Sequence, residues 1–314
     1  MSTVYESLKK SVVPIPAIDN TCAVVVTYQP DSELPDRLVS IREQVDRLYL
    51  VDNGSNEEAY ALLQRLADES STVELVANDT NLGIAVALNQ GAEAALEQGY
   101  DWLLMFDQDS TVETGLFTAL AAIYRQQVDC GRIGVIGSNY WHAATGQIAY
   151  NPARDGSASV NMETVITSGS LLSLHAFQEV GKFREELFID SVDNEYCLRL
   201  RARGLRVLLS TRPLMHHPMG QQKRYWLFGR RPSCTHYGPA RHYYLTRNRL
   251  TVMREWYARR PAWVWGECKA FFVALLMLLL YEEQKFKKLC AVALGIWHAL
   301  RGRLGPLSRK LDDT

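Results

Sequence analysis

Short apolar runs alternate with segments of helical spacing through the first 110 residues, and this alternation limits the fold more than any other feature of the chain. The apolar runs are rich in Val and Leu and end in polar turns, which is typical of buried strands. Four such strands separated by helices form the pattern of βαβ units. We therefore expect an α/β protein with a mostly parallel sheet and helices on both faces. The expected strands are 22–28, 47–55, 72–79 and 102–110, and the expected helices are a stretch ending near Val45, 57–70 and 83–99.

The second part of the chain is less regular. Apolar runs and helical spacing predict three further strands and two helices, one of which ends at Gly204. The expected strands are 133–141, 165–174 and 206–210, and the expected helices are 173–183 and 193–204.

Polar residues stand at the carboxyl end of each of the first four expected strands. In open α/β sheets, ligands bind beyond this edge. The residues are Thr27 and Tyr28, Asp52 and Asn53, Asn81, and Asp107 and Asp109. The sequence thus predicts one binding site along this edge.

The fourth strand runs directly into two carboxylates, Asp107 and Asp109, in the stretch LLMFDQDST. Residues two apart on an extended segment point to the same side, so these like charges converge. Convergent carboxylate oxygens suit Mg²⁺ or Mn²⁺, which keep coordination positions for the phosphates of a nucleotide. The alternative is a pair of loop carboxylates that cap a nearby helix.

Eight short motifs occur in the order VVTYQP, VDNGS, NLGIAVALNQG, FDQDS, ITSGSLLSL, LFIDSVDNEYCLR, HHPMG and YYLTRNRL. Together they resemble the inverting family 2 glycosyltransferases of GT-A fold, in particular the bacterial rhamnosyltransferase branch. The resemblance covers about residues 20–255 and implies a Rossmann-like GT-A domain. It divides the chain into an extension (1–20), a nucleotide-binding half (about 21–130), an acceptor-binding half (about 131–255) and an amphipathic helical region (256–314).

The resemblance assigns a set of residues to the nucleotide-sugar donor. Asp52 is expected to accept the N–H of a pyrimidine ring, although DNGS is also a good turn sequence. Asn89 lies within an expected helix and is either a donor contact or a brace. Arg247 is expected to pair with the diphosphate, as guanidinium groups do. The complete set is Thr27, Tyr28, Asp52, Asn53, Asn81, Gly83, Asn89, Asp107, Gln108 and Arg247.

In the resembling family, a histidine after the last core strand completes the metal or diphosphate site. Two histidines are available here, and the HxxG spacing favours His217 over His216. The resemblance therefore implies a Mg²⁺ or Mn²⁺ site of Asp107, Asp109 and His217. The alternative for either histidine is a satisfied core residue.

The resemblance makes Asp193 the catalytic base, which takes the proton of the acceptor hydroxyl. Relatives often have Glu-Asp here, whereas this chain has Val192-Asp193, so the role of the missing carboxylate is assigned to Asp190. Acids favoured by the helix dipole are the alternative reading of Asp193. The acceptor-binding residues implied are Ser168, Gly169, Ser170 and Asp190.

Charge divides the chain unevenly. Residues 1–211 hold 15 Lys and Arg against 29 Asp and Glu, and residues 212–314 hold 19 against 6. The basic third predicts an anionic partner. Its apolar run 270–281 is shorter than the roughly 20 residues that span a bilayer, and 285–305 has amphipathic spacing. We expect helices on an anionic membrane surface; packing on the domain or a homodimer contact is the alternative.

The implied function is transfer of L-rhamnose from dTDP-L-rhamnose to a saccharide acceptor, lipid-linked or free, in the synthesis of a bacterial surface polysaccharide. Alternatives are a UDP-sugar donor carrying a hexose or galactofuranose, and a non-catalytic nucleotide-sugar-binding module. A dinucleotide-binding fingerprint does not follow the first strand, and no nucleic acid partner is expected. Scattered cysteines and the polar N-terminal stretch favour the cytoplasm, at the inner face of the membrane.

Overall fold

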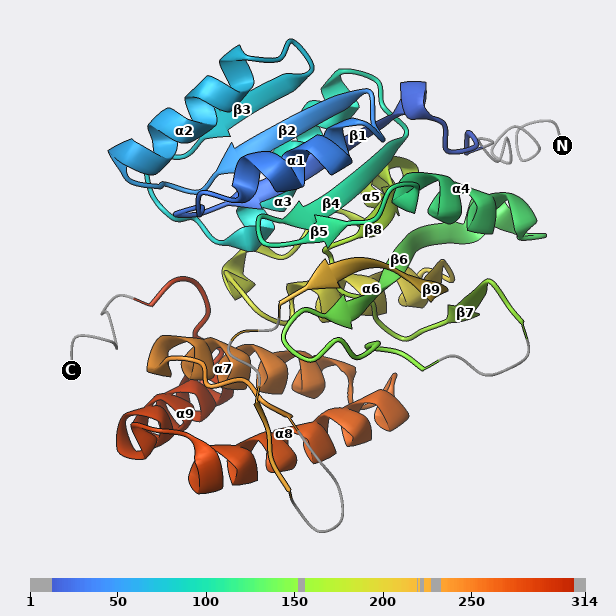
Figure 1. Ribbon diagram of the computed structural model, residues 1–314. Coiled ribbons are helices and arrows are strands. Elements are labelled where there is room, and N and C mark those ends of the chain that lie inside the picture. The colour runs from blue at the N-terminus through green and yellow to red at the C-terminus, as the bar shows by residue number, and fades with distance from the viewer. Residues whose placement is uncertain (1–12, 152–155, 219, 221–222, 227–232, 308–314) are drawn as a thin grey trace, which may run out of the picture.

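A computed structural model describes residues 13–151, 156–218, 220, 223–226 and 233–307. Within these residues, nine strands form one mixed sheet in the order β3-β2-β1-β4-β8-β6-β9-β5, and β7 pairs with β9 (Figure 1). The strands are β1 Thr21–Thr27, β2 Arg47–Asp52, β3 Val73–Ala77, β4 Trp102–Asp107, β5 Thr111–Val112, β6 Ile133–His142, β7 Ser159–Asn161, β8 Ser170–Ser173 and β9 Arg206–His217. Strands β10 (Lys223–Arg224) and β11 (Ser233–Cys234) form a separate antiparallel pair.

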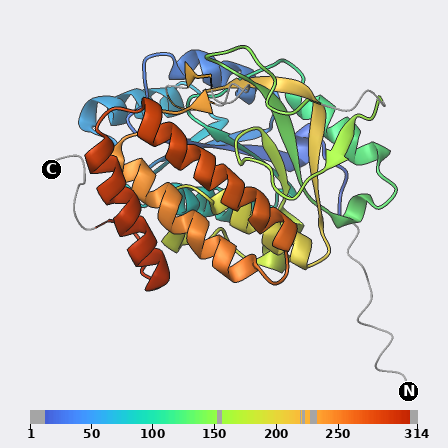
Figure 2. The same cartoon turned by 90° about the horizontal axis from the view of Figure 1, so that it is seen from below.

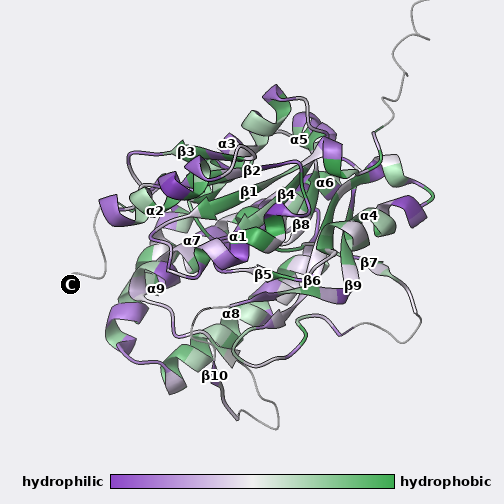
Figure 3. Ribbon diagram, turned by 45° about the horizontal axis from the view of Figure 1, so that its top comes forward, coloured by the Kyte–Doolittle hydropathy of each residue, from purple (hydrophilic) through white to green (hydrophobic). Residues whose placement is uncertain are grey.

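The first four strands are parallel, as the alternation of strands and helices predicts. Their register aligns Thr27 with Asp52 and Val26 with Asp107. The carboxyl ends of β1, β2 and β4 therefore meet at one edge, which is where ligands bind in such sheets. The hydrophobic strands β1 and β4 lie at the centre of the molecule (Figure 3).

In the described part of the chain, six helices cover the two faces of the sheet. Helices α1 (Leu34–Arg42), α2 (Glu57–Asp68) and α4 (Leu116–Gln126) bury their apolar sides in the core on one face. Helices α3 (Ile84–Glu97), α5 (Leu174–Val180) and α6 (Val192–Ala202) do so on the other. The Ala-rich side of α3 packs closely on the strands because its side chains are small.

Strand β8 is antiparallel to β4 and β6 and shorter than the expected strand 165–174. Gly169 has φ +71°, a left-handed conformation that suits glycine and ends an extended segment. Residues before Ser170 therefore form a turn rather than a strand. Strand β9 is longer than expected and reaches His217, because its second half pairs with both β6 and β5.

Three C-terminal helices form a layer beside the edge where the site lies. They are α7 (Pro239–Trp256), α8 (Pro261–Tyr281) and α9 (Lys285–Leu300). Helix α7 lies between the other two (Figure 2). Helix α8 has 21 residues and is long and apolar enough to cross a membrane, although the expected apolar run covered only its second half. Only 11% of its most apolar window is buried, so most of α8 faces outward.

Candidate active site

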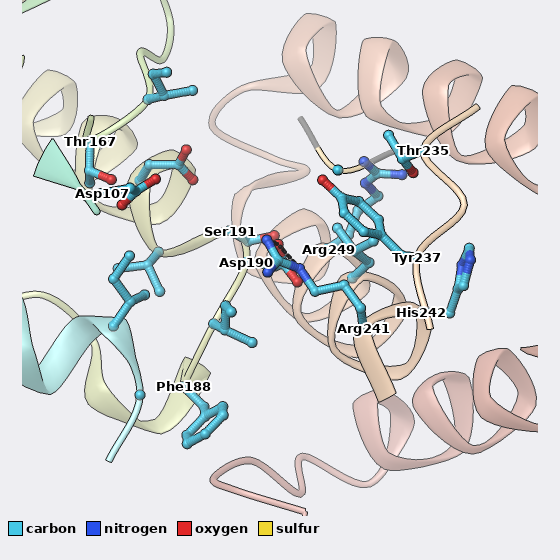
Figure 4. A pocket seen from close by; sticks show the side chains of 18 of the residues that line it. Asp107, Thr167, Phe188, Asp190, Ser191, Thr235, Tyr237, Arg241, His242 and Arg249 are labelled. Atoms are coloured by element: carbon cyan, nitrogen blue, oxygen red, sulfur yellow. Dashed lines mark hydrogen bonds and ion pairs between the residues drawn. The ribbon is translucent and has the colours of Figure 1, made fainter. Parts of the chain in front are cut away.

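A pocket of about 820 Å³ lies between the carboxyl edge of the sheet and the C-terminal helices. Asp107 and Thr167 stand on the sheet side, and Tyr237, Arg241, His242 and Arg249 stand on the opposite side (Figure 4). The pocket therefore joins residues from both halves of the chain.

The side chains of Asp107, Asp109 and His217 meet at the sheet end of the pocket. One ligand atom from each lies within 4.8 Å of the others. Nε2 of His217 is 3.9 Å from Oδ2 of Asp107, and Nδ1 is 3.7 Å from Oδ1 of Asp109. The Ser110 hydroxyl lies 2.9 Å from Nδ1 of His217 and orients the ring. His216 instead stacks on Trp141, so the histidine that lies beside the two carboxylates is His217.

The electrostatics of this cluster fit a divalent cation. Oδ1 of Asp109 is buried and has no hydrogen-bond partner. Burial, and then the charge of Asp107, raise the pKa of Asp109, so ionising both carboxylates is unfavourable without a positive charge between them. Two carboxylates and an imidazole are suitable ligands for Mg²⁺ or Mn²⁺.

A reciprocal hydrogen bond joins Tyr28, the residue after β1, to the turn that carries Asp107 and Asp109. The Gln108 side chain accepts from the Tyr28 backbone N–H at 2.8 Å and donates to the Tyr28 carbonyl at 3.0 Å. Thr27, Tyr28 and Gln108 all line the pocket. Tyr28 is 47% exposed, so its side chain remains available to stack on a flat ligand.

Asn53 and Asn81 brace the wall beside Tyr28 and also line the pocket. The Asn53 amide donates to Oδ1 of Asn81 at 3.1 Å, and that oxygen also accepts the Gly83 backbone N–H at 2.9 Å. Gly83 has φ +91°, and a Cβ there would lie 2.5 Å from the Phe188 carbonyl oxygen. Only glycine allows α3 to begin this close to residue 188.

Two expected donor contacts lie behind the pocket wall. Asp52 is 1% exposed, and its carboxylate accepts from the backbone N–H and the hydroxyl of Ser55. Asn89 is also 1% exposed; it donates to the Phe183 carbonyl and accepts the Phe183 N–H. Asp52 therefore stabilises the turn after β2. Asn89 links α3 to the backbone of Phe183, which corresponds to the bracing role named as the alternative above.

Asp193 lies at the start of α6 and lines the pocket. Its carboxylate accepts the Asn194 backbone N–H at 2.7 Å. Burial, together with the charges of Asp190 and Asp107, raises the pKa of Asp193 to about 6. A carboxylate with this pKa is ionised at neutral pH yet basic enough to accept a proton during a reaction.

The segment before Asp193 has a strained backbone. Phe188, Asp190 and Ser191 have φ values of +66°, +66° and +62°. Such conformations are costly for non-glycine residues and persist where surrounding contacts enforce them, often at functional sites. Arg241 contributes one of these contacts, because its guanidinium lies 2.8 Å from Oδ1 of Asp190. Oδ2 of Asp190 is buried and has no partner.

Arg247 does not reach the pocket, in contrast to the expected diphosphate contact. It is 1% exposed and donates to the carbonyls of Leu187 at 3.1 Å and Gly305 at 2.6 Å. The neighbouring Asn248 amide donates to the carbonyls of Leu187 and Ile189. These two residues of α7 therefore stabilise the strained segment that leads to Asp193.

The expected acceptor residues Ser168, Gly169 and Ser170 also lie behind the wall. The Ser168 hydroxyl accepts the Asp107 N–H at 3.2 Å, and the Ser170 hydroxyl donates to the Ile166 carbonyl. A Cβ at Gly169 would lie 2.5 Å from the Met215 sulfur. The turn thus supports the end of the pocket where Asp107 and Asp109 lie, and its residue Thr167 lines the pocket.

Several polar residues that line the pocket were not predicted from the sequence, among them three on or just before α7. Arg241 and Arg249 come from α7, and Tyr237 precedes that helix, with its ring 5.1 Å from the Arg241 guanidinium. The eight-residue spacing of the two arginines places them on one side of a helix. That spacing, after Pro239, was the available signal.

Comparison with known proteins gives a family and a relative. Residues 22–181 match the sequence profile described as Glycosyl transferase family 2. The chain is 31% identical over 248 residues to the dTDP-rhamnosyl transferase RfbF of Shigella flexneri. That match covers 75% of this chain and 80% of RfbF.

Solved structures share the fold at low sequence identity. Residues 1–349 of S. aureus TarS superpose with a TM-score of 0.59 at 13% identity, covering 90% of this chain and 82% of that one. A structure of GalNAc-T7 with UDP, GalNAc and Mn²⁺ has a TM-score of 0.55 at 15% identity. That match covers 78% of this chain, which spans about half (51%) of the GalNAc-T7 chain.

Proposed function

Because this chain belongs to glycosyl transferase family 2, we propose that it transfers L-rhamnose from dTDP-L-rhamnose to a saccharide acceptor, with inversion, in the synthesis of a bacterial surface polysaccharide. The relationship to RfbF, a dTDP-rhamnosyl transferase, supports the choice of donor. The GT-A fold and the enzyme class follow from the family.

One observation carries the chemical part of the proposal. The Asp107, Asp109 and His217 cluster and the Asp193 carboxylate line the same pocket. Single displacement with inversion needs a charged group at the leaving diphosphate and a base at the acceptor hydroxyl. This pocket offers both.

Asp107, Asp109 and His217 would hold a divalent cation, Mg²⁺ or Mn²⁺, which when bound offsets negative charge on the departing nucleotide diphosphate. Tyr28 offers its exposed ring to the base of the nucleotide. Asp193 accepts the proton of the acceptor hydroxyl as that oxygen attacks the anomeric carbon. Arg241 keeps the segment before Asp193 in position through its pair with Asp190.

We infer that the reaction occurs in the cytoplasm. The six cysteines are free, which is usual for proteins of a reducing compartment.

The test is a thermal-shift and turnover panel with Mn²⁺ and dTDP-L-rhamnose, UDP-glucose, UDP-galactose or UDP-galactofuranose. We expect dTDP-L-rhamnose to raise the melting temperature most, because a ligand stabilises the folded state that binds it. It should also be the donor from which dTDP is released. Preferential turnover of a UDP-sugar would overturn the donor assignment, and binding without release of diphosphate would indicate a non-catalytic module.

A further inference from the structure

Helices α8 and α9 lie on the face of the molecule that Figure 2 turns toward the viewer. Both helices expose large apolar side chains. We call these side chains the apolar surface. Its members are Trp265, Phe272, Val273, Leu279 and Leu280 of α8, and Phe286, Trp297 and Leu300 of α9. Phe286 is 81% exposed, Leu300 70% and Phe272 69%, values that are unusual for such side chains in water.

The exposed apolar positions on α9 follow a helical repeat, which also includes Ala293. Phe286, Ala293, Trp297 and Leu300 are exposed at intervals of seven, four and three residues, which is one side of a helix. The opposite side of α9 packs on α7. There the Tyr243 hydroxyl forms a hydrogen bond of 2.7 Å with Nδ1 of His298. The exposed stripe is therefore a second apolar side, which packing on the domain does not use.

Basic side chains surround the apolar surface. Between residues 261 and 307, all of which are described, five basic residues are exposed against one acidic residue. The Arg301 guanidinium lies 4.0 Å from the Trp297 ring centre, and the Lys269 ammonium 5.1 Å from that of Trp265. The five are Lys269, Lys285, Lys287, Arg301 and Arg303, and the acidic residue is Glu283.

We propose that the apolar surface binds a bilayer rich in anionic lipids, with α8 and α9 lying in the plane of the interface. Aromatic rings beside Lys or Arg suit the headgroup level, and exposed cations attract anionic lipid. A second copy of the chain is the weaker candidate, because a symmetric contact would bring the basic residues of both copies together.

Helix α8 lies along the interface rather than across it, because its other side belongs to the protein. Met277 and Leu278 are 1% exposed, and Glu267 pairs with Arg249 of α7 at 3.0 Å. Moving α8 across a bilayer would break these contacts.

The inner side of α8 also lines the active-site pocket, through Phe271, Ala274, Leu275 and Leu278. A bilayer on the outer side would lie one helix diameter from this pocket wall, about 10 Å. If the proposed transferase function holds, this arrangement suits an acceptor saccharide carried on a membrane lipid.

The experiment is flotation of the full chain with vesicles of phosphatidylglycerol and phosphatidylethanolamine, at low and high salt. We expect binding that falls with salt and is weak on phosphatidylcholine alone. The double variant Phe272→Asp/Phe286→Asp should bind at least tenfold more weakly, since burying one Phe side chain is worth about tenfold or more. Brominated lipids should quench tryptophan fluorescence of the unaltered protein, a result that requires no variant to fold.

The matched control is Val39→Asp/Val128→Asp, which places the same charges at exposed apolar positions outside the apolar surface. Both variants should keep the unaltered melting temperature. Equal binding of the double variant and the control would overturn the proposal, as would absence of quenching. A dimer that the double variant disrupts, without vesicle binding, would assign the surface to a second copy. Release of dTDP from the donor in solution is measured separately, so a failed donor assignment would not be confused with these outcomes.

Discussion

The elevated pKa of Asp193 leads to a prediction about the pH dependence of transfer. The active form of a general base is the ionised carboxylate, so kcat/KM should rise with pH until Asp193 is fully ionised. Burial and the charges of Asp190 and Asp107 place this transition near pH 6. A group with a pKa of 6 is about 90% ionised at pH 7 and about 10% at pH 5, so the rate should fall roughly ninefold over that interval.

Two variants test whether Asp193, and the charge of Asp190 beside it, cause this pH dependence. Asp193→Asn should lower kcat by about 10²–10⁴-fold, the usual contribution of a general base. Asp190→Asn should move the acid limb to lower pH, because it removes a negative charge that raises the pKa of Asp193.

The assay measures initial rates of dTDP release with acceptor between pH 4.5 and 8.5, together with calorimetric binding of dTDP at each pH. The binding data distinguish a slower chemical step from a weaker affinity for the donor. Asn194→Ala is unsuitable as a control variant, because the Asn194 backbone contacts Asp193. His175→Ala, in α5, serves instead. Turnover by Asp193→Asn within tenfold of the unaltered enzyme would refute the reasoning. So would an acid limb that Asp190→Asn moves to higher pH.

Other predictions address the cation site, the brace and the C-terminal helices. Asp109→Asn should weaken Mn²⁺ binding at least tenfold in electron paramagnetic resonance titrations, because one carboxylate ligand is lost; His216→Ala should not, and equal losses in both would contradict the ligand assignment. Arg247→Ala should lower the free energy of unfolding by about 3 kcal/mol or more in urea titrations, because buried carbonyls lose their donor; a raised donor KM without loss of stability would restore the diphosphate role. Burial opposes ionisation of Glu282, but hydrogen bonds from His242 and Lys288 outweigh it and lower the Glu282 pKa to about 2. Its folded pKa thus lies below the unfolded value of about 4.3, so its stabilisation is complete above that value and is lost as pH falls toward 2. Thermal unfolding should show this loss, and a Glu282→Gln variant with the same acid dependence would contradict it.

The parallel half of the sheet could be predicted because its signals are local. Each of the first four strands carries its own apolar run and polar end, and parallel pairing brings those ends together. Asp107 and Asp109 were predicted to lie at this edge for this reason. His217, from a distant strand, was added by the HxxG spacing and the family resemblance, and the structure brings its side chain close to both carboxylates.

Burial places several of the predicted residues outside the pocket, and burial depends on partners far along the chain. The sequence around Arg247 suggested a contact with the diphosphate, but its guanidinium donates instead to the carbonyls of residues 187 and 305. Ser168 and Ser170 follow an apolar run, yet the left-handed Gly169 between them turns both hydroxyls toward the protein interior. The positive φ values near Asp190 have no local signal, since Phe and Ser seldom adopt them.

The contacts of Gly305 have a practical consequence for work with shortened versions of the protein. Its N–H donates to the Glu186 carbonyl at 2.7 Å, and its carbonyl accepts from Arg247 at 2.6 Å. Gly305, which follows α9, therefore helps to hold the segment before Asp193 in place. A truncation that removes α8, α9 and the residues after them to gain solubility would also remove these two hydrogen bonds. Loss of activity in a truncated enzyme could then result from damage to the segment before Asp193. Substitutions on the intact chain are therefore needed to test whether turnover depends on lipid.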